Sequence, residues 1–170
     1  DKVKWHLIGT LQTNKVKYII DKVTMIHSLD REALCEEIQK RAEKIDRIID
    51  CLVQVNISKE ETKHGLYKDD VVDFVKMVSE KSIEQKLRTE TKKMGGWAVK
   101  FSSPGLDGMP DRLVLFPGGK LGFVELKAPG KKMRPLQEKR KRTLEELGFL
   151  VFCVDSKEMI GGVLHEIRTL

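Results

Sequence analysis

Residues 112–128 read RLVLFPGGKLGFVELKA, two apolar runs joined by PGGK. A glycine pair between alternating apolar segments is typical of the turn of a β-hairpin. In the second run, Glu125 and Lys127 are two residues apart, so both side chains project from the same face of the strand. An acid and a base inside an apolar strand indicate a candidate functional site.

The hairpin also determines the position of Asp111. A turn centred between the two glycines of PGGK pairs Asp111 with Leu126, and a regular ladder then places Asp111 on the face opposite to Glu125. We therefore expect an irregularity: an odd-sized loop, a bulge, or departure of Asp111 from the pleat after the preceding proline. Any of the three brings Asp111 to the face of Glu125 and Lys127.

The remainder of residues 80–170 predicts further strands and helices. Ser82 with Gln85 three residues later is a capping box, which predicts a helix ending near Met94 before a glycine pair. WAVKF and FLVFCVD are expected strands, and SKEMIGGVLHEI is an expected final helix. Another helix is expected from Pro135 to Gly148, because proline is tolerated in a first turn and glycine ends helices.

The first part of the chain predicts a βαβαβ alternation. WHLIG, TMIHSL and CLVQVNIS are the expected strands, and a helix is expected from Arg31 to Ile49 with Asp30 as its N-cap. Strands that alternate with helices are usually parallel, and parallel strands are usually covered on both faces. We expect parallel pairing in this region.

Composition places the chain among globular proteins. Of its 170 residues, 40% are hydrophobic and 34% are charged, which is enough for a core. No apolar run is long enough to cross a bilayer, and the first residues lack the pattern of a secretory signal, so we expect a cytoplasmic protein without a membrane partner. The three cysteines lie far apart without a CxxC pair, which indicates neither a disulfide framework nor a zinc site.

Charge is distributed unevenly along the chain. Residues 1–79 contain 14 basic and 14 acidic side chains, whereas residues 80–170 contain 18 basic and 12 acidic ones. A basic excess favours a polyanionic partner, because lysine and arginine that bind phosphates release counterions. A solvated lysine-rich surface is the alternative, and on charge alone it is the favoured interpretation.

Two carboxylates held close together repel each other, and a hard divalent cation relieves that repulsion. Asp111 and Glu125 therefore predict a Mg²⁺ site, with Mn²⁺ as a second candidate. Such an ion lowers the pKa of its bound water, and Lys127 beside it would hold that water or neutralise charge on phosphorus. The alternative is an exposed Glu–Lys salt bridge worth about 0–1 kcal/mol, and the ExK pattern alone favours it.

The joint pattern of residues 80–170 changes this balance. GMPDRLVLFPGG and FVELKAPG are preceded by a glutamate-bearing helix and GGWAVKFSSPG, and are followed by RPLQEKRKRTLEELGF. This order resembles the VRR-NUC branch of the PD-(D/E)XK nucleases, especially the small stand-alone forms of phages. The resemblance implies a restriction-endonuclease-like α/β/α domain with a mixed sheet. It implies metal ligation by Glu84, Asp111 and Glu125, and catalytic roles for these three with Lys127 and Gln137.

The same resemblance implies a DNA partner and phosphodiester hydrolysis, with branched or structured DNA as the expected substrate and a homodimer as a candidate assembly. Basic residues near the proposed site are candidates for phosphate contacts, with a solvated helix face as the alternative for about half of them. The nucleic-acid-binding candidates are Lys131, Lys132, Arg134 and Arg140.

Residues 1–79 resemble a different family. WHLIGTLQTNKVKYI, MIHSLD and LVQVNISKEETKHGL are similar to the central part of the pyridoxal-phosphate homeostasis proteins, which are (β/α)8 barrels. No lysine here aligns with the one that binds the cofactor, so pyridoxal phosphate is not an expected partner. We interpret the chain as a fusion of a truncated barrel fragment, residues 1–79, with a nuclease domain, residues 80–170. A regulatory fragment that binds pyridoxal phosphate without catalysis is the alternative function.

Overall fold

The computed structural model describes residues 3–60 and 62–170. The chain divides into two compact units, Asp1–Val78 and Ser79–Leu170, which we call the first and the second unit. The division falls within helix α2 (Val71–Lys93). Among the described residues, no helix is both long and apolar enough to span a membrane.

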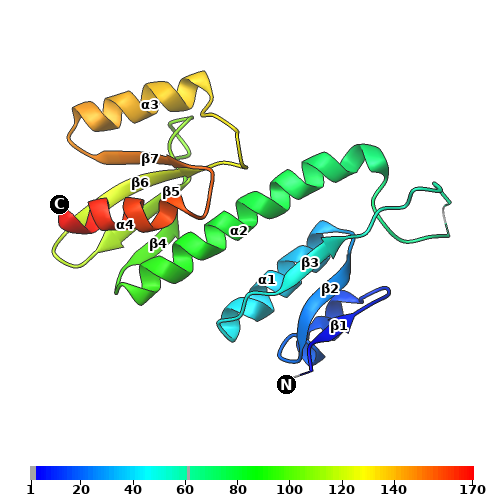
Figure 1. The fold of residues 1–170 in the computed structure, drawn as a ribbon. Helices are drawn as coiled ribbons and strands as arrows, with labels where there is room; N and C mark the ends of the chain where they lie inside the picture. Colours follow the sequence, from blue (N-terminus) through cyan, green and yellow to red (C-terminus); the bar gives the residue numbers. More distant parts are fainter. Residues whose placement is uncertain (1–2, 61) are drawn as a thin grey trace. The chain divides into compact units, whose positions relative to one another are not determined.

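The first unit is built around a parallel sheet (Figure 1). Its elements are β1 (Trp5–Leu7), the 3-10 helix η1 (Thr13–Tyr18), β2 (Val23–Leu29), α1 (Glu32–Lys44), β3 (Asp50–Val53) and the 3-10 helix η2 (Lys68–Asp70). The strands lie in the order β1-β2-β3, and both pairs are parallel. The alternation of strands and helices and the parallel pairing expected from the sequence are confirmed.

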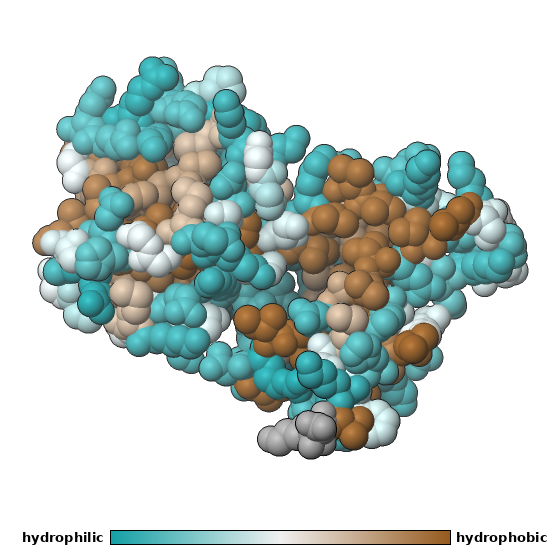
Figure 2. Space-filling view, in the orientation of Figure 1, coloured by the Kyte–Doolittle hydropathy of each residue, from teal (hydrophilic) through white to brown (hydrophobic). Residues whose placement is uncertain are grey.

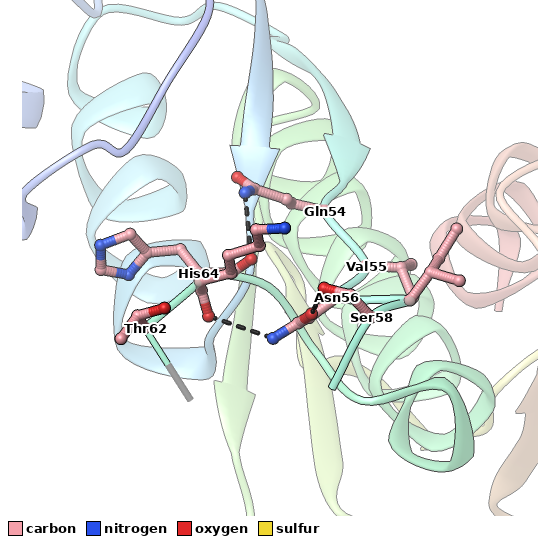
Figure 3. A pocket seen from close by; sticks show the side chains of 8 residues that line it. Gln54, Val55, Asn56, Ser58, Thr62 and His64 are labelled. Carbon is pink, nitrogen blue, oxygen red and sulfur yellow. Dashed lines mark hydrogen bonds between the residues drawn. The ribbon is translucent and has the colours of Figure 1, made fainter. Parts of the chain in front are cut away.

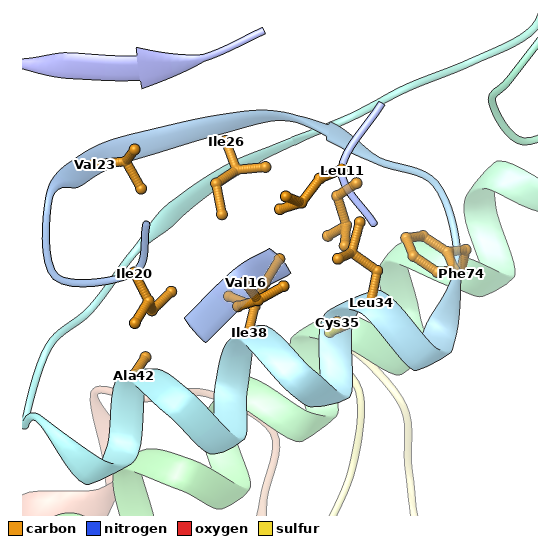
Figure 4. Packing of buried hydrophobic residues seen from close by; sticks show 11 residues of the cluster. Leu11, Val16, Ile20, Val23, Ile26, Leu34, Cys35, Ile38, Ala42 and Phe74 are labelled. Carbon is orange, nitrogen blue, oxygen red and sulfur yellow. The ribbon is translucent and has the colours of Figure 1, made fainter. Parts of the chain in front are cut away.

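The core of the first unit lies between the sheet, η1 and α1 (Figure 4). Val16 of η1, Ile26 of β2 and Leu34 of α1 are fully buried. Ile38 and one further turn of α1 extend the same apolar face, which follows the spacing of three and four residues seen in the sequence. One helix face therefore covers one face of the sheet.

Helix α1 is shorter than the sequence pattern predicted. It ends at Lys44, not at Ile49, because the chain turns at Asp46, whose φ of 49° is left-handed. Its N-cap is Arg31, not Asp30, and no side chain caps the helix. The Asp30 carboxylate instead accepts a hydrogen bond from the Arg31 guanidinium at 2.5 Å.

Three strands do not close a barrel, so the sheet of the first unit remains open. Within the described residues, β1 and β3 are edge strands that pair only with β2. Of the 18 large apolar side chains exposed in the described part of the chain, 11 belong to the first unit, among them Trp5, Ile48 and Leu52. Figure 2 shows apolar side chains gathered on the visible face of this unit. Such surface is expected to favour association.

The second unit contains a mixed sheet between helices (Figure 1). Its strands are β4 (Trp97–Lys100), β5 (Arg112–Phe116), β6 (Lys120–Leu126) and β7 (Leu150–Val154), in that order; β4-β5-β6 are antiparallel and β6-β7 are parallel. Helices α2 and α4 (Met159–Thr169) pack on one face, and α3 (Pro135–Glu146) packs on the other. The expected α/β/α arrangement is confirmed.

The start of α2 differs from the prediction. Ser82 does not cap a helix, because α2 begins at Val71 and Ser82 lies in its interior. The residues before Ser82 are themselves helical, and one of them, Phe74, is buried in the core of the first unit. The helix ends before Gly95, whose φ of 79° stops it as expected.

Candidate active site

The turn of the β5–β6 hairpin aligns the two acids. Phe116 pairs with Lys120, so the loop has three residues, and both of its glycines have positive φ, 83° and 76°. The register pairs Leu113 with Phe123, and its extension by one pleat places Asp111 opposite Glu125 on the same face. The irregularity expected from the sequence is therefore confirmed, and of its three candidate forms the structure has the odd-sized loop.

Asp111 lies just before β5 and is fixed through its backbone and its carboxylate. Its carbonyl accepts a hydrogen bond from Phe101 N at 2.8 Å, and its Oδ1 accepts one from Leu126 N at 3.4 Å. Burial and the nearby charge of Glu125 raise the pKa of the Asp111 carboxyl from 3.8 to about 6, although Arg112 acts in the opposite direction. The site thus disfavours two ionised carboxylates side by side.

Glu125 is the most deeply buried acid of the site, with 3% of the residue exposed. Its Oε1 accepts hydrogen bonds from Lys127 Nζ and Gln137 Nε2. Its Oε2 is buried and has no hydrogen-bond partner among the described residues. A buried carboxylate oxygen without a partner is costly, so this oxygen suits a cation or a water that the fold does not supply.

Gln137 and Lys127 hold Glu125 from two elements. Gln137 is buried in the first turn of α3, where its Oε1 accepts a hydrogen bond from Arg134 N at 2.9 Å and its amide donates to Glu125. Pro135 starts this helix in its first turn, as the sequence predicted. The backbone N–H of Lys127 donates to Val154 O at 2.9 Å, which fixes the end of β6 beside β7.

Glu84 does not join this group. Its Oε1 lies 2.6 Å from Nη2 of Arg112, whose side chain extends toward α2. Among residues 3–60 and 62–170, no three His, Cys, Asp or Glu side chains form a group that could hold a metal ion. The structure therefore brings together Asp111, Glu125, Lys127 and Gln137, and it places Glu84 with Arg112.

Two further residues near the site had no role assigned from the sequence. Arg112 directly follows Asp111 in the chain. Strand alternation is the one sequence signal that places its guanidinium on the face of the sheet opposite to Asp111. Glu80 lies one turn before Glu84 on α2, and its charge contributes to the raised pKa of Asp111. The sequence contains both acids but does not show which of the two charges acts on Asp111.

The candidate phosphate-binding residues occupy two environments. Lys131, Lys132 and Arg134 are exposed in the segment between β6 and the body of α3. Arg140 instead donates from Nε to the carbonyl of Asp107 at 3.0 Å, which ties α3 to the loop before β5. Three of the four residues are thus free to face an external anion.

The first unit has a separate pocket of about 610 Å³ in the segment after β3 (Figure 3). Asn56, which is 5% exposed, donates from its side-chain amide to the carbonyls of Glu60 at 2.8 Å and Lys63 at 3.2 Å. Ser58 Oγ donates to Asn56 Oδ1 at 3.2 Å. These contacts explain why an asparagine sits at this point of the motif: it organises the loop that lines the pocket.

The fold and the converging side chains define a class: the second unit is an α/β/α domain with a mixed sheet, in which an acid, a lysine and a glutamine meet at the end of one strand. The chain belongs to the same family as "Putative nuclease p44" of Acyrthosiphon pisum secondary endosymbiont phage 1, with 47% identity over 85 residues that cover 50% of this chain and 91% of the phage protein. A solved "VRR_NUC domain" is 28% identical, with a TM-score of 0.48, and the match covers 51% of this chain and 95% of that one. No protein-family model matches the chain.

A second set of relatives has a different name. "Pyridoxal phosphate homeostasis protein" of Aquifex aeolicus (strain VF5) is 51% identical over 72 residues, 42% of this chain and 32% of that protein. The protein of the same name from Helicobacter pylori (strain ATCC 700392 / 26695) is 34% identical over 87 residues, 51% of this chain and 39% of that protein. The chain therefore spans well under half of these relatives. Both resemblances noted in the sequence are confirmed: one part of the chain is similar to the phage nuclease, and another part is similar to the pyridoxal phosphate homeostasis proteins.

Proposed function

We propose that the chain is a Mg²⁺-dependent nuclease that hydrolyses phosphodiester bonds in DNA through residues 79–170. The observation that carries the proposal is the facing pair Asp111 and Glu125, in which one carboxyl has a raised pKa and the other has a buried oxygen without a hydrogen-bond partner. A family relationship to a protein named as a nuclease supports the same activity.

The donor set fits a hard divalent cation. Asp111 and Glu125 offer carboxylate oxygens, the ligands that Mg²⁺ prefers, and Mn²⁺ is a second candidate. When bound there, the ion would polarise a phosphoryl oxygen and lower the pKa of a coordinated water. Lys127 lies beside Glu125, where its ammonium is placed to hold the attacking water or to neutralise charge developing on phosphorus. Gln137 keeps the Glu125 carboxylate in one orientation.

Glu84 of α2 is left out of this donor set, because its carboxylate is bound to Arg112.

The exposed residues Lys131, Lys132 and Arg134 are proposed to contact substrate phosphates. Such contacts carry no base information, so they predict binding that falls with salt concentration and depends weakly on sequence. We propose branched or structured DNA as the preferred substrate, on the basis of the VRR-NUC resemblance.

A cleavage assay tests the proposal. The full chain is incubated with linear, flap and junction DNA in the presence of Mg²⁺ or of EDTA. Cleavage that requires Mg²⁺ and falls by about 100-fold or more in Lys127→Ala is expected, the scale of losing one positioned proton-transfer or charge-stabilising group. Asp107→Asn is the matched control, since its carbonyl and not its carboxylate contacts Arg140. Equal cleavage by wild type and Lys127→Ala would contradict the proposed site.

A further inference from the structure

Arg112 is a buried arginine beside the candidate active site, and it has no part in the proposed chemistry. Only 9% of Arg112 is exposed, and its Nη2 lies 2.6 Å from Oε1 of Glu84, whose side chain is itself 27% exposed. The Nε of Arg112 is buried without a hydrogen-bond partner among the described residues. Placing a guanidinium there is costly unless an anion accompanies it, so Glu84 is the partner that makes the arrangement stable.

The position of Arg112 in β5 links this ion pair to Asp111. Arg112 pairs with Val124 in β6 and with Lys100 in β4, so its backbone lies within the sheet. Neighbouring residues of a strand point to opposite faces, so the guanidinium is anchored on the α2 side while Asp111 faces Glu125. The ion pair therefore ties α2 to the strand one residue from the proposed catalytic acid.

The contact also limits what Glu84 can do. A carboxylate oxygen bound to a buried guanidinium loses that interaction if it turns to another cation, and breaking a buried pair is strongly destabilising. In addition, the Arg112 side chain lies with Val114 and Phe116 on the face packed by α2 and α4, whereas Asp111 and Glu125 face α3. Glu84 is thus committed to the opposite side of the sheet.

We propose that Glu84 and Arg112 form a positioning pair that seats Asp111 for catalysis, and that Glu84 is not a metal ligand. This proposal rests on the proposed nuclease function and assigns a role to two residues outside its chemistry. Arg112 acts through its neighbour Asp111, and Glu84 acts through Arg112. Neither residue touches the substrate or the metal.

A double-mutant cycle on the full chain tests the pair. The variants are Glu84→Gln, Arg112→Gln, the double variant and Arg112→Lys, with Lys86→Gln as an exposed control on the same helix. We expect each single variant to lower kcat about tenfold, the double variant to lose no more than either single one, and Arg112→Lys to recover part of the loss. Losses that multiply in the double variant would overturn the pairing.

Metal binding separates positioning from ligation. Mn²⁺ affinity of each variant is measured by calorimetry, which does not depend on cleavage. Positioning predicts that Glu84→Gln and Arg112→Gln lower the affinity to the same extent, by up to about 10–100-fold, because both variants remove the support of one ligand, Asp111. A tenfold or greater loss confined to Glu84→Gln would make Glu84 a ligand and refute the proposal.

A third readout remains informative if the chain cleaves no DNA. The backbone amide of Leu126 donates a hydrogen bond to Asp111 Oδ1. The NMR ¹H–¹⁵N signal of this amide therefore reports the position of the Asp111 carboxylate. Glu84→Gln and Arg112→Gln should move this signal in the same way, and Lys86→Gln should leave it in place. An unmoved Leu126 signal in folded Glu84→Gln protein would overturn the positioning role, whereas absent cleavage with moved signals would contradict only the nuclease proposal.

Discussion

Asp111→Asn should stabilise the metal-free protein while abolishing the proposed DNA cleavage. Burial and Glu125 raise the pKa of Asp111 from 3.8 to about 6, a shift of about two units. At about 1.4 kcal/mol per unit, ionising this group at neutral pH costs up to about 3 kcal/mol, and partial solvent access lowers our expectation to about 1–2 kcal/mol. Asparagine keeps the shape and can still accept the hydrogen bond from Leu126 N, but it has no charge.

The direction of the pKa change determines how the stability difference between wild type and Asp111→Asn varies with pH. The folded-state pKa lies above the unfolded one, so protonated Asp111 contributes its full stability below about pH 4 and loses it as the pH rises through about 6. The advantage of Asp111→Asn should therefore be largest above pH 7 and vanish near pH 4. Titrating groups that do not interact with Asp111 are common to both proteins and cancel in the comparison.

Calorimetry of the full chain in EDTA, at several pH values, measures this difference. A gain of 1–2 kcal/mol corresponds to a rise of roughly 4–16 °C in the Tm of a domain of this size. Saturating Mg²⁺ should then raise the Tm of the wild type and have little effect on the variant, because ligand binding to the native state adds about 2.7 kcal/mol at 100 times Kd. A variant that is less stable than wild type at pH 7.5 in EDTA would refute the electrostatic reasoning.

Three further predictions concern other parts of the chain. Gly122→Ala should destabilise the second unit by about 1–3 kcal/mol in denaturant unfolding, because a Cβ there would lie 2.6 Å from Ile167 Cδ1. An unchanged unfolding midpoint would show that Ile167 of α4 moves aside without cost. Asn56→Ala should lower the stability of the first unit by about 1–3 kcal/mol, since two buried carbonyl contacts are lost; unaltered hydrogen exchange around β3 would contradict it. Added pyridoxal phosphate should produce no Schiff-base absorbance band. A band that disappears when one lysine in residues 1–79 is replaced would support the alternative function.

The strongest sequence signals were those enforced by periodicity. The hairpin, its odd loop and the helix beginning at Pro135 follow from alternation, paired glycines and proline chemistry, and the structure contains all three. These features act within a few residues, so the sequence reveals them directly. They also bring Asp111, Glu125 and Lys127 to one place.

The parts that escaped prediction depend on distant partners. The capping pattern at Ser82 is overridden because the preceding segment is already helical and buries Phe74 in a core formed elsewhere in the chain. The partner of Glu84 is Arg112, 28 positions later, and no local pattern distinguishes a glutamate that meets an arginine from one that meets a metal. Sequence spacing identifies an acid-bearing helix, but only three-dimensional packing decides which acid serves the site.

The three-residue loop between β5 and β6 has a consequence for length variation. Because side chains alternate along a strand, adding or removing one residue at positions 117–119 would turn Glu125 and Lys127 to the α2 side while Asp111 stayed on the α3 side. Adding two residues would restore the match. The proposed active site therefore requires an odd number of residues in this loop, and relatives that keep the site are expected to differ there by even numbers of residues.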